Sequence, residues 1–273
     1  MNFDITGAIV LYRNDRPLLL SAINSFLNTE LRVKLLLVDN SPTDELKDII
    51  TDSRVVYVHN PANPGFGASH NYAINEALAQ SKYHLVLNPD IYFESGVLEG
   101  LIAYMDANDD IGVVMPKILY PDGQIQYLAK LLPTPFDFII RRFLPLKSFK
   151  EKMAHRFELR ASGYDQIMDV PFLSGCFLVF RTEALKTTGG FDDKIFMYTE
   201  DIDICRRINQ HNYRSVFYPR VHAYHAHERK SFLKMKTFAV YLRSAVYYFN
   251  KWGWFYDKER AEINNRTLSQ IKT

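Results

Sequence analysis

Residues 33–41 read Val-Lys-Leu-Leu-Leu-Val-Asp-Asn-Ser, an apolar run that ends in a carboxylate, an amide and a hydroxyl. A short apolar run bounded by turn-forming residues predicts a β-strand. Four comparable runs occur in the first 115 residues, at Ile5–Tyr12, Val55–His59, Tyr83–Leu87 and Ile111–Met115. The stretch at 33–41 is therefore one member of a repeated strand pattern.

Helical patterns separate these runs, at Pro17–Asn28, Thr43–Thr51, Ala68–Ala79 and Ser95–Asn108. Strands that alternate with helices predict an α/β fold, with a mostly parallel, Rossmann-like sheet flanked by helices. A mixed C-terminal portion follows, with predicted strands at Phe172–Phe180 and Arg214–Phe217, and helices near Thr182–Lys186, from Glu200, and from about Ser231 to Asn250. No linker rich in Pro, Gly or Ser divides the chain, which favours one domain, and the segment from Pro133 to Met168 has no clean period.

Composition excludes several classes of protein. The 273 residues are 47% apolar and 23% charged, which is typical of a globular protein rather than a disordered one. A net charge of +2 gives no reason to expect nucleic-acid binding. Cys176 and Cys205 each lie in an apolar pattern, as expected for reduced core thiols in a cytosolic protein. The N-terminus lacks a signal-peptide pattern, and no apolar run is long enough to span a bilayer.

Polar residues follow three of the predicted strands, where a parallel sheet collects its ligands. They are Tyr12-Arg13-Asn14, Asp39-Asn40-Ser41 and Asn88-Pro89-Asp90. Asp39 can accept hydrogen bonds from a base or ribose, or can form an Asx turn. Asp90 can ligate a hard divalent cation, which would need diphosphate oxygens and water to complete its shell.

The run Asn63-Pro64-Gly65-Phe66-Gly67-Ala68-Ser69-His70-Asn71 places small residues at a predicted helix start. Backbone N–H groups there can approach a phosphate or ribose, although many ordinary loops have the same composition.

Three carboxylates crowd the start of another predicted helix, in Met197-Tyr198-Thr199-Glu200-Asp201-Ile202-Asp203. Closely packed acids repel one another, which suggests a function. The alternative is structural, with Thr199 as the helix cap and the acids at the positive helix end. Ile202, Cys205 and Ile208 form the predicted apolar face, and Asp203 is expected to pair with Arg206 or Arg207.

Residues 221–231, Val-His-Ala-Tyr-His-Ala-His-Glu-Arg-Lys-Ser, concentrate imidazole, guanidinium, ammonium and hydroxyl groups in one predicted loop. In an extended segment His225 and His227 share a face, and Arg229 and Ser231 continue it. These groups suit a metal or phosphate site, and a solvated loop that happens to be rich in histidine is the alternative. Neither cysteine lies at zinc-ligand spacing from them.

The predicted C-terminal helix carries an apolar stripe, followed by an aromatic cluster at Trp252, Trp254, Phe255 and Tyr256. The stripe consists of Phe232, Met235, Phe238, Leu242, Ala245 and Phe249, with basic residues around it. This pattern suits a helix that lies in a membrane interface, and equally a helix packed on the core or on a second subunit.

Taken together, the motifs resemble those of family 2 glycosyltransferases of GT-A fold, and among these the rhamnosyltransferase-type enzymes of bacterial surface polysaccharide synthesis. The resemblance extends from Thr6 to about Ser231 and rests on the order and spacing of short motifs. They are residues 9–14, Val38-Asp39-Asn40-Ser41, residues 63–67, Leu87-Asn88-Pro89-Asp90, Ser174-Gly175-Cys176, Gly189-Gly190-Phe191-Asp192, residues 200–203 and residues 225–231.

The resemblance implies inverting transfer of a sugar, L-rhamnose from a dTDP donor, to a lipid-linked or oligosaccharide acceptor at the cytoplasmic membrane face. It implies a catalytic domain over residues 1–230, with a nucleotide-binding half at 1–115 and an acceptor half at 116–230, and a helical extension at 231–273. It also implies Asp201 as general base with Glu200 beside it, Asp39 on the base of the donor, and Mg²⁺ or Mn²⁺ held by Asp90 and His225. The remaining donor-binding residues that it implies are Leu11, Tyr12, Asn14, Asn40, Gly65, Phe66, Asn71, Asn88, Arg229 and Ser231.

This chain departs from the wider family at one motif, and two other functions remain open. Where the wider family often has Asp-x-Asp, this chain has Asn88-Pro89-Asp90, with a single carboxylate. A nucleotidyltransferase would release pyrophosphate instead of a nucleoside diphosphate, and a glycan-binding protein on the same fold would not turn over. The sequence leaves the sugar, the acceptor and the oligomeric state undetermined, and a homo-oligomer is compatible with it.

Overall fold

The computed structural model describes residues 1–137, 147–226 and 235–271. The strands in these ranges are β1 (Phe3–Leu11), β2 (Val33–Asp39), β3 (Val55–His59), β4 (Ser81–Leu87), β5 (Ile91–Tyr92), β6 (Ile111–Leu119), β7 (Ala129–Lys130), β8 (Met168–Asp169), β9 (Phe172–Leu173), β10 (Phe177–Arg181) and β11 (Arg214–His225). The helices are α1 (Arg16–Leu27), α2 (Phe66–Gln80), α3 (Val97–Asp106), α5 (Lys147–Phe157), α6 (Thr182–Thr188), α7 (Glu200–Gln210), α8 (Met235–Trp252) and α9 (Lys258–Leu268), with a 3₁₀ turn at Arg160–Ser162.

The central sheet has the strand order β3-β2-β1-β4-β10-β6-β11-β5, and β8 pairs with β11. Its first four strands are parallel, and β6 and β11 are parallel to each other. β10 is antiparallel to both of its neighbours, β4 and β6. The predicted α/β fold with a mostly parallel sheet is confirmed, and the insertion of β10 makes the sheet continuous across both halves of the chain.

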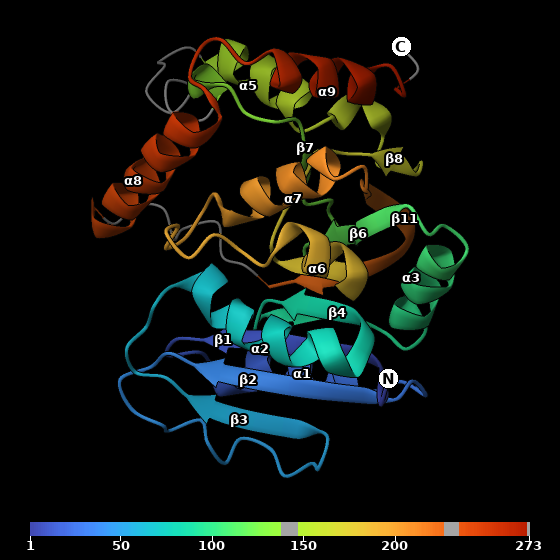
Figure 1. The fold of residues 1–273 in the computed structure, drawn as a ribbon, viewed down its shortest axis with the longest axis vertical. Helices are drawn as coiled ribbons and strands as arrows, with labels where there is room; N and C mark the ends of the chain where they lie inside the picture. Colours follow the sequence, from blue (N-terminus) through green and yellow to red (C-terminus); the bar gives the residue numbers. More distant parts are fainter. Residues whose placement is uncertain (138–146, 227–234, 272–273) are drawn as a thin grey trace.

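Helices cover both faces of the parallel strands because successive side chains of a strand point to opposite faces. On one face Ala8 and Leu36 pack against Ala73 of α2. On the other face a Cβ at Gly7 would lie 2.8 Å from the ring of Phe26, so glycine lets α1 lie close to the sheet. Figure 1 shows β3 at one end of the molecule and the helices α5, α8 and α9 at the opposite end.

The predicted helix at Thr43–Thr51 is wrong, because this stretch forms successive turns. Lys47 N–H donates to Asp44 O at 2.9 Å and Ile49 N–H donates to Leu46 O at 3.1 Å. These bonds bury Leu46 and Ile49 without a regular helix. An apolar spacing of three residues suits consecutive tight turns as well as a helix.

Two predicted strands have different bounds in the structure. The strand expected over Phe172–Phe180 is divided into β9 and β10, because Gly175 N–H leaves the ladder to donate to Asp201. The strand expected over Arg214–Phe217 continues to His225, with a register shift between Tyr218 and His222. The described part of the predicted histidine-rich loop is therefore strand.

The C-terminal helix α8 begins at Met235 and packs its last turns into the molecule. Ala245 and Phe249 of the predicted stripe are 0% exposed, whereas Leu242 is 37% exposed. Two of the four stripe residues whose side chains the structure describes are therefore core, so the end of this helix packs on the molecule and the stripe as a whole is not a membrane surface. Among the helices in the described ranges, none is long and apolar enough to cross a bilayer.

Candidate active site

Asp201, at the start of α7, is held by two backbone amides. Gly175 N–H donates to its Oδ2 at 3.0 Å, and its own neighbour Ile202 donates to its Oδ1 at 2.9 Å. A Cβ at Gly175 would lie 3.3 Å from the Cβ of Asp201 and 3.5 Å from the ring of Phe66. Glycine at 175 therefore brings the strand break, the start of α2 and the carboxylate together.

Glu200 lies beside Asp201 in a more enclosed position, 5% exposed, and its Oε2 has no hydrogen-bond partner among the described residues. Burial raises the pKa of Glu200, and the negative charge of Asp201 raises it further. Burial also raises the pKa of Asp201, while the N–H groups of Gly175 and Ile202 oppose that rise. Both oxygens of Asp201 thus accept a backbone amide, whereas Oε2 of Glu200 has no partner among the described residues, and the two acids are suited to different protonation states.

The backbone before this pair is strained. Tyr198 has φ of 91°, a left-handed value that is rare outside glycine. Thr199 does not cap the helix with its side chain, and its hydroxyl instead donates to Ser244 O on α8 at 3.3 Å. Strained backbone of this kind is often found at functional sites.

The other side chains predicted on α7 are structural. Ile202, Cys205 and Ile208 are 0% exposed, so the predicted apolar face is confirmed. Asp203 pairs with Arg207 at 2.8 Å, as predicted. It also accepts from Lys251 and Trp252 at the end of α8, which ties that helix to α7.

Asp90 and His225 meet at the adjacent strand ends. β5 pairs with β11 so that Ile91 lies opposite His225, and Ala226 N–H donates to Asp90 O at 2.9 Å. This pairing places His225 Nε2 at 3.3 Å from Asp90 Oδ1. His222, one of the other candidates, points instead at Tyr224.

The separation of these two atoms fits two neighbouring ligands of a six-coordinate divalent cation, which lie about 3 Å apart when metal–ligand bonds are about 2.1 Å long. No further His, Cys, Asp or Glu joins them in the described residues to make a cluster of three. Such a pair leaves the remaining positions to diphosphate oxygens and water, which is usual for cations that act on nucleotides.

The Asp201 and Asp90 sites are joined through Ser174-Gly175-Cys176. Gly175 binds Asp201, while Cys176 O accepts from Asn88 N–H at 2.8 Å. Burial raises the pKa of the Cys176 thiol to about 12, and the charges of Asp90 and Asp201 add to this rise, so the thiol lies near both carboxylates. Both cysteines are buried and free, as predicted.

Asp39 lies at the end of β2, separated from β4 only by β1, a distance of about 10 Å at ordinary strand spacing. It is 0% exposed. Its Oδ1 accepts from Ser41 N–H at 2.8 Å, which forms the Asx turn that was the structural alternative for this residue. Its Oδ2 accepts from Tyr57 OH at 2.7 Å. Its carboxylate thus orders the loop that follows β2.

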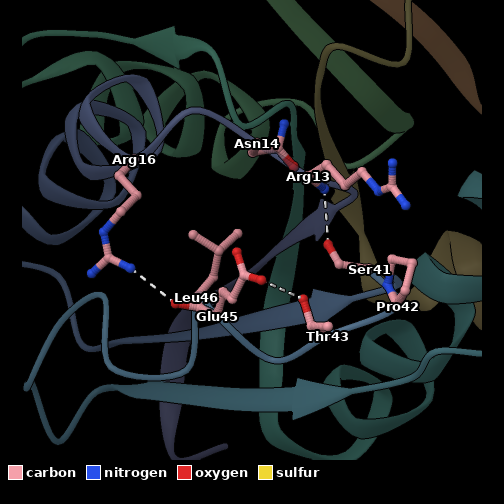
Figure 2. Close-up of a pocket in the computed structure, with 8 residues that line it drawn as sticks. All are labelled: Arg13, Asn14, Arg16, Ser41, Pro42, Thr43, Glu45 and Leu46. Atoms are coloured by element: carbon pink, nitrogen blue, oxygen red, sulfur yellow. Dashed lines mark hydrogen bonds between the residues drawn. The ribbon is translucent and has the colours of Figure 1, made fainter.

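A pocket of about 460 Å³ opens beside this loop (Figure 2). It is lined by Arg13, Asn14, Arg16, Ser41, Pro42, Thr43, Glu45 and Leu46. Figure 2 shows Arg13 and Arg16 on opposite sides of it, with Arg16 hydrogen-bonded to Glu45 O and Arg13 N–H to Ser41 Oγ. Two guanidinium groups beside the ends of parallel strands are suited to binding an anion.

Several predicted donor-binding residues have structural contacts in the described chain. Leu11 is buried, Tyr12 is half exposed, and Asn14 accepts from Tyr12 N–H at 2.7 Å. Asn40 exchanges hydrogen bonds with Ser69 of α2, and Asn88 bonds to Cys176.

Gly65, Phe66 and Asn71 contact the loop that leads to Glu200. Phe66 N–H donates to Phe196 O at 3.0 Å, and a Cβ at Gly65 would lie 2.5 Å from that same oxygen. The side chain of Asn71 bonds to both backbone groups of Phe191. In this structure the glycine-rich run therefore organises the 190–199 loop, and its contact with a donor stays a prediction. Arg229, Ser231 and His227 lie outside the described residues.

Three contributions were not predicted. Arg16 lines the pocket. A basic residue next to the motif at residues 9–14 could have suggested this role from the sequence. Gly175 contributes through its backbone N–H, and the sequence holds no side chain there that could indicate the contact with Asp201. Gln126, which binds His225, is 99 residues away from it in sequence, and nothing in a single sequence pairs the two.

The chain is similar to known glycosyltransferases in sequence and in fold. Residues 8–189 match the model of glycosyl transferase family 2, and residues 148–255 match that of glycosyl transferase family group 2. A relative named N-acetylglucosaminyl-diphospho-decaprenol L-rhamnosyltransferase, from Mycobacterium tuberculosis, is 28% identical over 73% of this chain and 68% of its own length. The rhamnosyltransferase WbbL of Escherichia coli is 27% identical over 77% of this chain and 76% of its own.

Solved structures share the fold at low sequence identity. GalNAc-T7 with UDP, GalNAc and Mn²⁺ superposes with a TM-score of 0.65 at 14% identity, over 91% of this chain and 49% of that one. The mannosyltransferase PcManGT from Pyrobaculum calidifontis, in complex with GDP-Man and Mn²⁺, gives a TM-score of 0.58 at 16% identity, over 85% of this chain and 59% of that one. This chain thus spans about half the length of these structures. With the match over residues 8–189 and a GT-A fold, the chain belongs to glycosyl transferase family 2.

Proposed function

We propose that this glycosyltransferase moves L-rhamnose from dTDP-rhamnose to a lipid-linked or oligosaccharide acceptor, with inversion at the sugar carbon. The observation that carries the proposal is the joining of two sites by one short segment. Gly175 binds Asp201, and Cys176 binds the strand end that leads to Asp90 and His225. A base and a diphosphate-binding group on two sides of one reacting sugar are what an inverting transfer needs.

Asp201 is assigned as the general base. Its two amide donors keep the carboxylate fixed in orientation, and burial raises its pKa, so it accepts a proton better than an ordinary aspartate. It would remove the proton of the acceptor hydroxyl as that oxygen attacks. Glu200, protonated more readily, would donate a hydrogen bond through its unpartnered carboxyl oxygen to the acceptor or the sugar.

Asp90 and His225 would hold Mg²⁺ or Mn²⁺, which would neutralise the charge that develops on the departing diphosphate. An imidazole ligand beside a single carboxylate suits Mn²⁺ better than Mg²⁺. Asp39 and the pocket beside it are assigned to the nucleotide, with Arg13 and Arg16 near the phosphates or ribose.

The choice of rhamnose and of a lipid-linked acceptor is supported by the names of the two relatives. Cytoplasmic location at the inner face of the membrane is part of the same proposal. Its structural support is the turn after α8, where Phe255 is 85% exposed and Tyr256 is 92% exposed. Paired exposed aromatic rings are typical of segments that enter the headgroup region of a bilayer.

The test is an incubation of the protein with a panel of nucleoside diphosphate sugars and Mn²⁺, followed by analysis of the released nucleotide. The expected product is dTDP from dTDP-rhamnose, and its release increases with a polyprenyl diphosphate sugar acceptor. Pyrophosphate release would identify a nucleotidyltransferase. Binding of a glycan without release of any nucleotide would identify a non-catalytic protein.

A further inference from the structure

Gln126 is a buried polar residue in the segment that follows β6. It is 5% exposed, and its backbone N–H donates to Ile118 O at 2.9 Å. Leu119 and Ile125 form an isolated bridge across the turn before it. The backbone therefore fixes where the Gln126 side chain begins, and a buried amide at that position needs partners.

Its side chain binds His225 through two bonds that form a closed pair, and Gln126 Nε2 also lies 3.5 Å from Leu119 O. Gln126 Nε2 lies 2.8 Å from His225 O, and Gln126 Oε1 lies 3.0 Å from His225 Nδ1. A carbonyl oxygen only accepts, so the NH₂ group of Gln126 must face it. The amide oxygen then faces Nδ1, and because that oxygen also only accepts, Nδ1 must carry the proton.

This pairing determines the chemistry of the opposite side of the ring. With the proton on Nδ1, a neutral His225 has its lone pair on Nε2, and Nε2 lies 3.3 Å from Asp90 Oδ1. The bond to Nδ1 also restricts rotation of the imidazole, and the bond to His225 O fixes the orientation of the Gln126 amide that makes it. A ring that is held in one tautomer and one orientation is the arrangement by which outer partners support metal-ligating histidines.

We propose that Gln126 is a positioning residue that holds His225 in the Nδ1–H tautomer and thereby sets its affinity for a divalent cation. The inference rests on the proposed function, since it takes Asp90 and His225 as the residues that hold the cation. Gln126 acts through His225 and does not itself touch donor or acceptor.

Two substitutions separate this role from a structural one. Gln126→Leu removes both bonds to His225. Gln126→Glu keeps an oxygen that accepts from Nδ1–H, but it replaces the donor to His225 O with a second carboxylate oxygen and adds a negative charge. Both variants therefore lose the same backbone bond, whereas only Gln126→Leu releases the tautomer. Loss of an outer partner commonly lowers metal affinity by about 10- to 100-fold.

The experiment is titration of Mn²⁺ into the wild-type protein and both variants in the presence of dTDP, with free Mn²⁺ measured by electron paramagnetic resonance. Thermal melts of the three proteins without metal establish that each is folded. We expect Gln126→Leu to bind Mn²⁺ about 10-fold or more weakly than wild type, and Gln126→Glu to bind within about 3-fold of it.

Equal affinity of Gln126→Leu and wild type would overturn the inference alone, as would equal weakness of the two folded variants. If the wild-type protein with dTDP bound no Mn²⁺, the assignment of Asp90 and His225 would fail, and the inference with it. If Gln126→Leu does not fold, the comparison of Gln126→Glu with wild type decides, because a loss greater than 10-fold there contradicts the role of the accepting oxygen.

Discussion

At the scale of single residues, the two acids that begin α7 differ in their partners. Asp201 receives two backbone N–H groups, whereas Oε2 of Glu200 is buried without a partner in the described chain. The enzyme thus keeps a destabilised carboxyl group next to its proposed base. Such arrangements are common in active sites, where function is obtained at some cost in stability.

This cost predicts how stability depends on pH. The pKa of Glu200 is raised in the folded protein by burial and by Asp201, so the folded state binds the proton more tightly than the unfolded chain. Its contribution to stability is present at low pH and is lost as pH rises through the folded-state pKa. Glu200→Gln is neutral at every pH and should lack this loss.

Thermal melts at pH 5 and pH 9 measure the effect. Relative to wild type, the Glu200→Gln variant should gain about 2 °C or more between the two pH values, since one pKa unit corresponds to about 1.4 kcal/mol. Glu183→Gln on α6 is the matched control, with a side chain 65% exposed. Identical pH dependence of Glu200→Gln and wild type would show that Glu200 has no raised pKa.

At the scale of elements, the start of α2 and the 190–199 loop fit each other closely. Gly65 has φ of 108°, and a Cβ there would lie 2.5 Å from Phe196 O. Gly96 has a similar φ of 91°, with nothing within 4 Å of its Cβ position. Substitutions at the two glycines therefore distinguish the effect of backbone strain from the effect of a collision with the loop.

Gly65→Ala should destabilise the protein by about 3 kcal/mol or more, because strain of about 1–2 kcal/mol is added to a backbone collision. Gly96→Ala should show the strain alone, about 1–2 kcal/mol. Urea denaturation of both variants measures the difference. Equal losses in the two proteins would mean that the loop moves aside freely at Gly65.

A second element-scale prediction concerns α9, which is tied to α7 by a buried ion pair. Arg206 Nη1 lies 2.7 Å from Asp257 Oδ2, with side chains 1% and 3% exposed. Asp257 also caps α9 by accepting from Arg260 N–H. Removing one member of a buried pair costs about 3–5 kcal/mol. Without Asp257, Arg206 would keep only the half-exposed Glu259, at 2.9 Å, as an acidic partner among the described residues.

Asp257→Ala should therefore lower the free energy of unfolding by about that amount. Glu262→Ala is the control, since its pair with Lys258 at 3.6 Å is exposed on both sides, at 65% and 80%. Exposed pairs contribute about 0–1 kcal/mol. Chemical denaturation of both variants checks the prediction, and a loss below about 1 kcal/mol for Asp257→Ala would contradict it.

These elements also show what a single sequence can predict. The runs at residues 5–12, 33–38 and 83–87 identified central strands, because a short apolar run between turn-forming residues rarely forms any structure other than a buried strand. The motif after the run at 83–87 identified Asp90 as a candidate, and the acidic cluster at residues 200–203 identified Asp201. The turns at residues 43–51 were not separable from a helix, since both bury Leu46 and Ile49. The contacts Gly175–Asp201 and Gln126–His225 depend on how β10 and β11 enter the sheet, which periodicity does not contain.

At the scale of the whole molecule, the helices α5, α8 and α9 gather at the end of the molecule opposite β3 (Figure 1). The turn between α8 and α9 exposes Phe255 by 85% and Tyr256 by 92%, while Phe249 and Ala245 are buried. Membrane contact through this turn is compatible with the fold, whereas contact through the whole predicted stripe is not.

Replacement of both aromatic residues, Phe255→Ser with Tyr256→Ser, should reduce binding to liposomes of anionic lipid by about 100-fold or more, since each of the two buried rings contributes about 1.5–3 kcal/mol and about 1.4 kcal/mol is a factor of ten. The melting temperature should stay within about 2 °C of wild type, because both side chains are exposed. Cosedimentation with liposomes is the measurement. Equal cosedimentation of wild type and variant would exclude this turn as the contact.

The central claim is that Asp201 is the base of a sugar transfer whose donor is bound by other residues. The most direct test compares wild type and Asp201→Asn for nucleoside diphosphate release at saturating donor and acceptor, with donor affinity measured by calorimetry. Turnover by Asp201→Asn should fall by about 10²- to 10⁴-fold, while donor affinity stays within about 3-fold of wild type. Turnover by Asp201→Asn equal to that of wild type would contradict the assignment of Asp201 as the base.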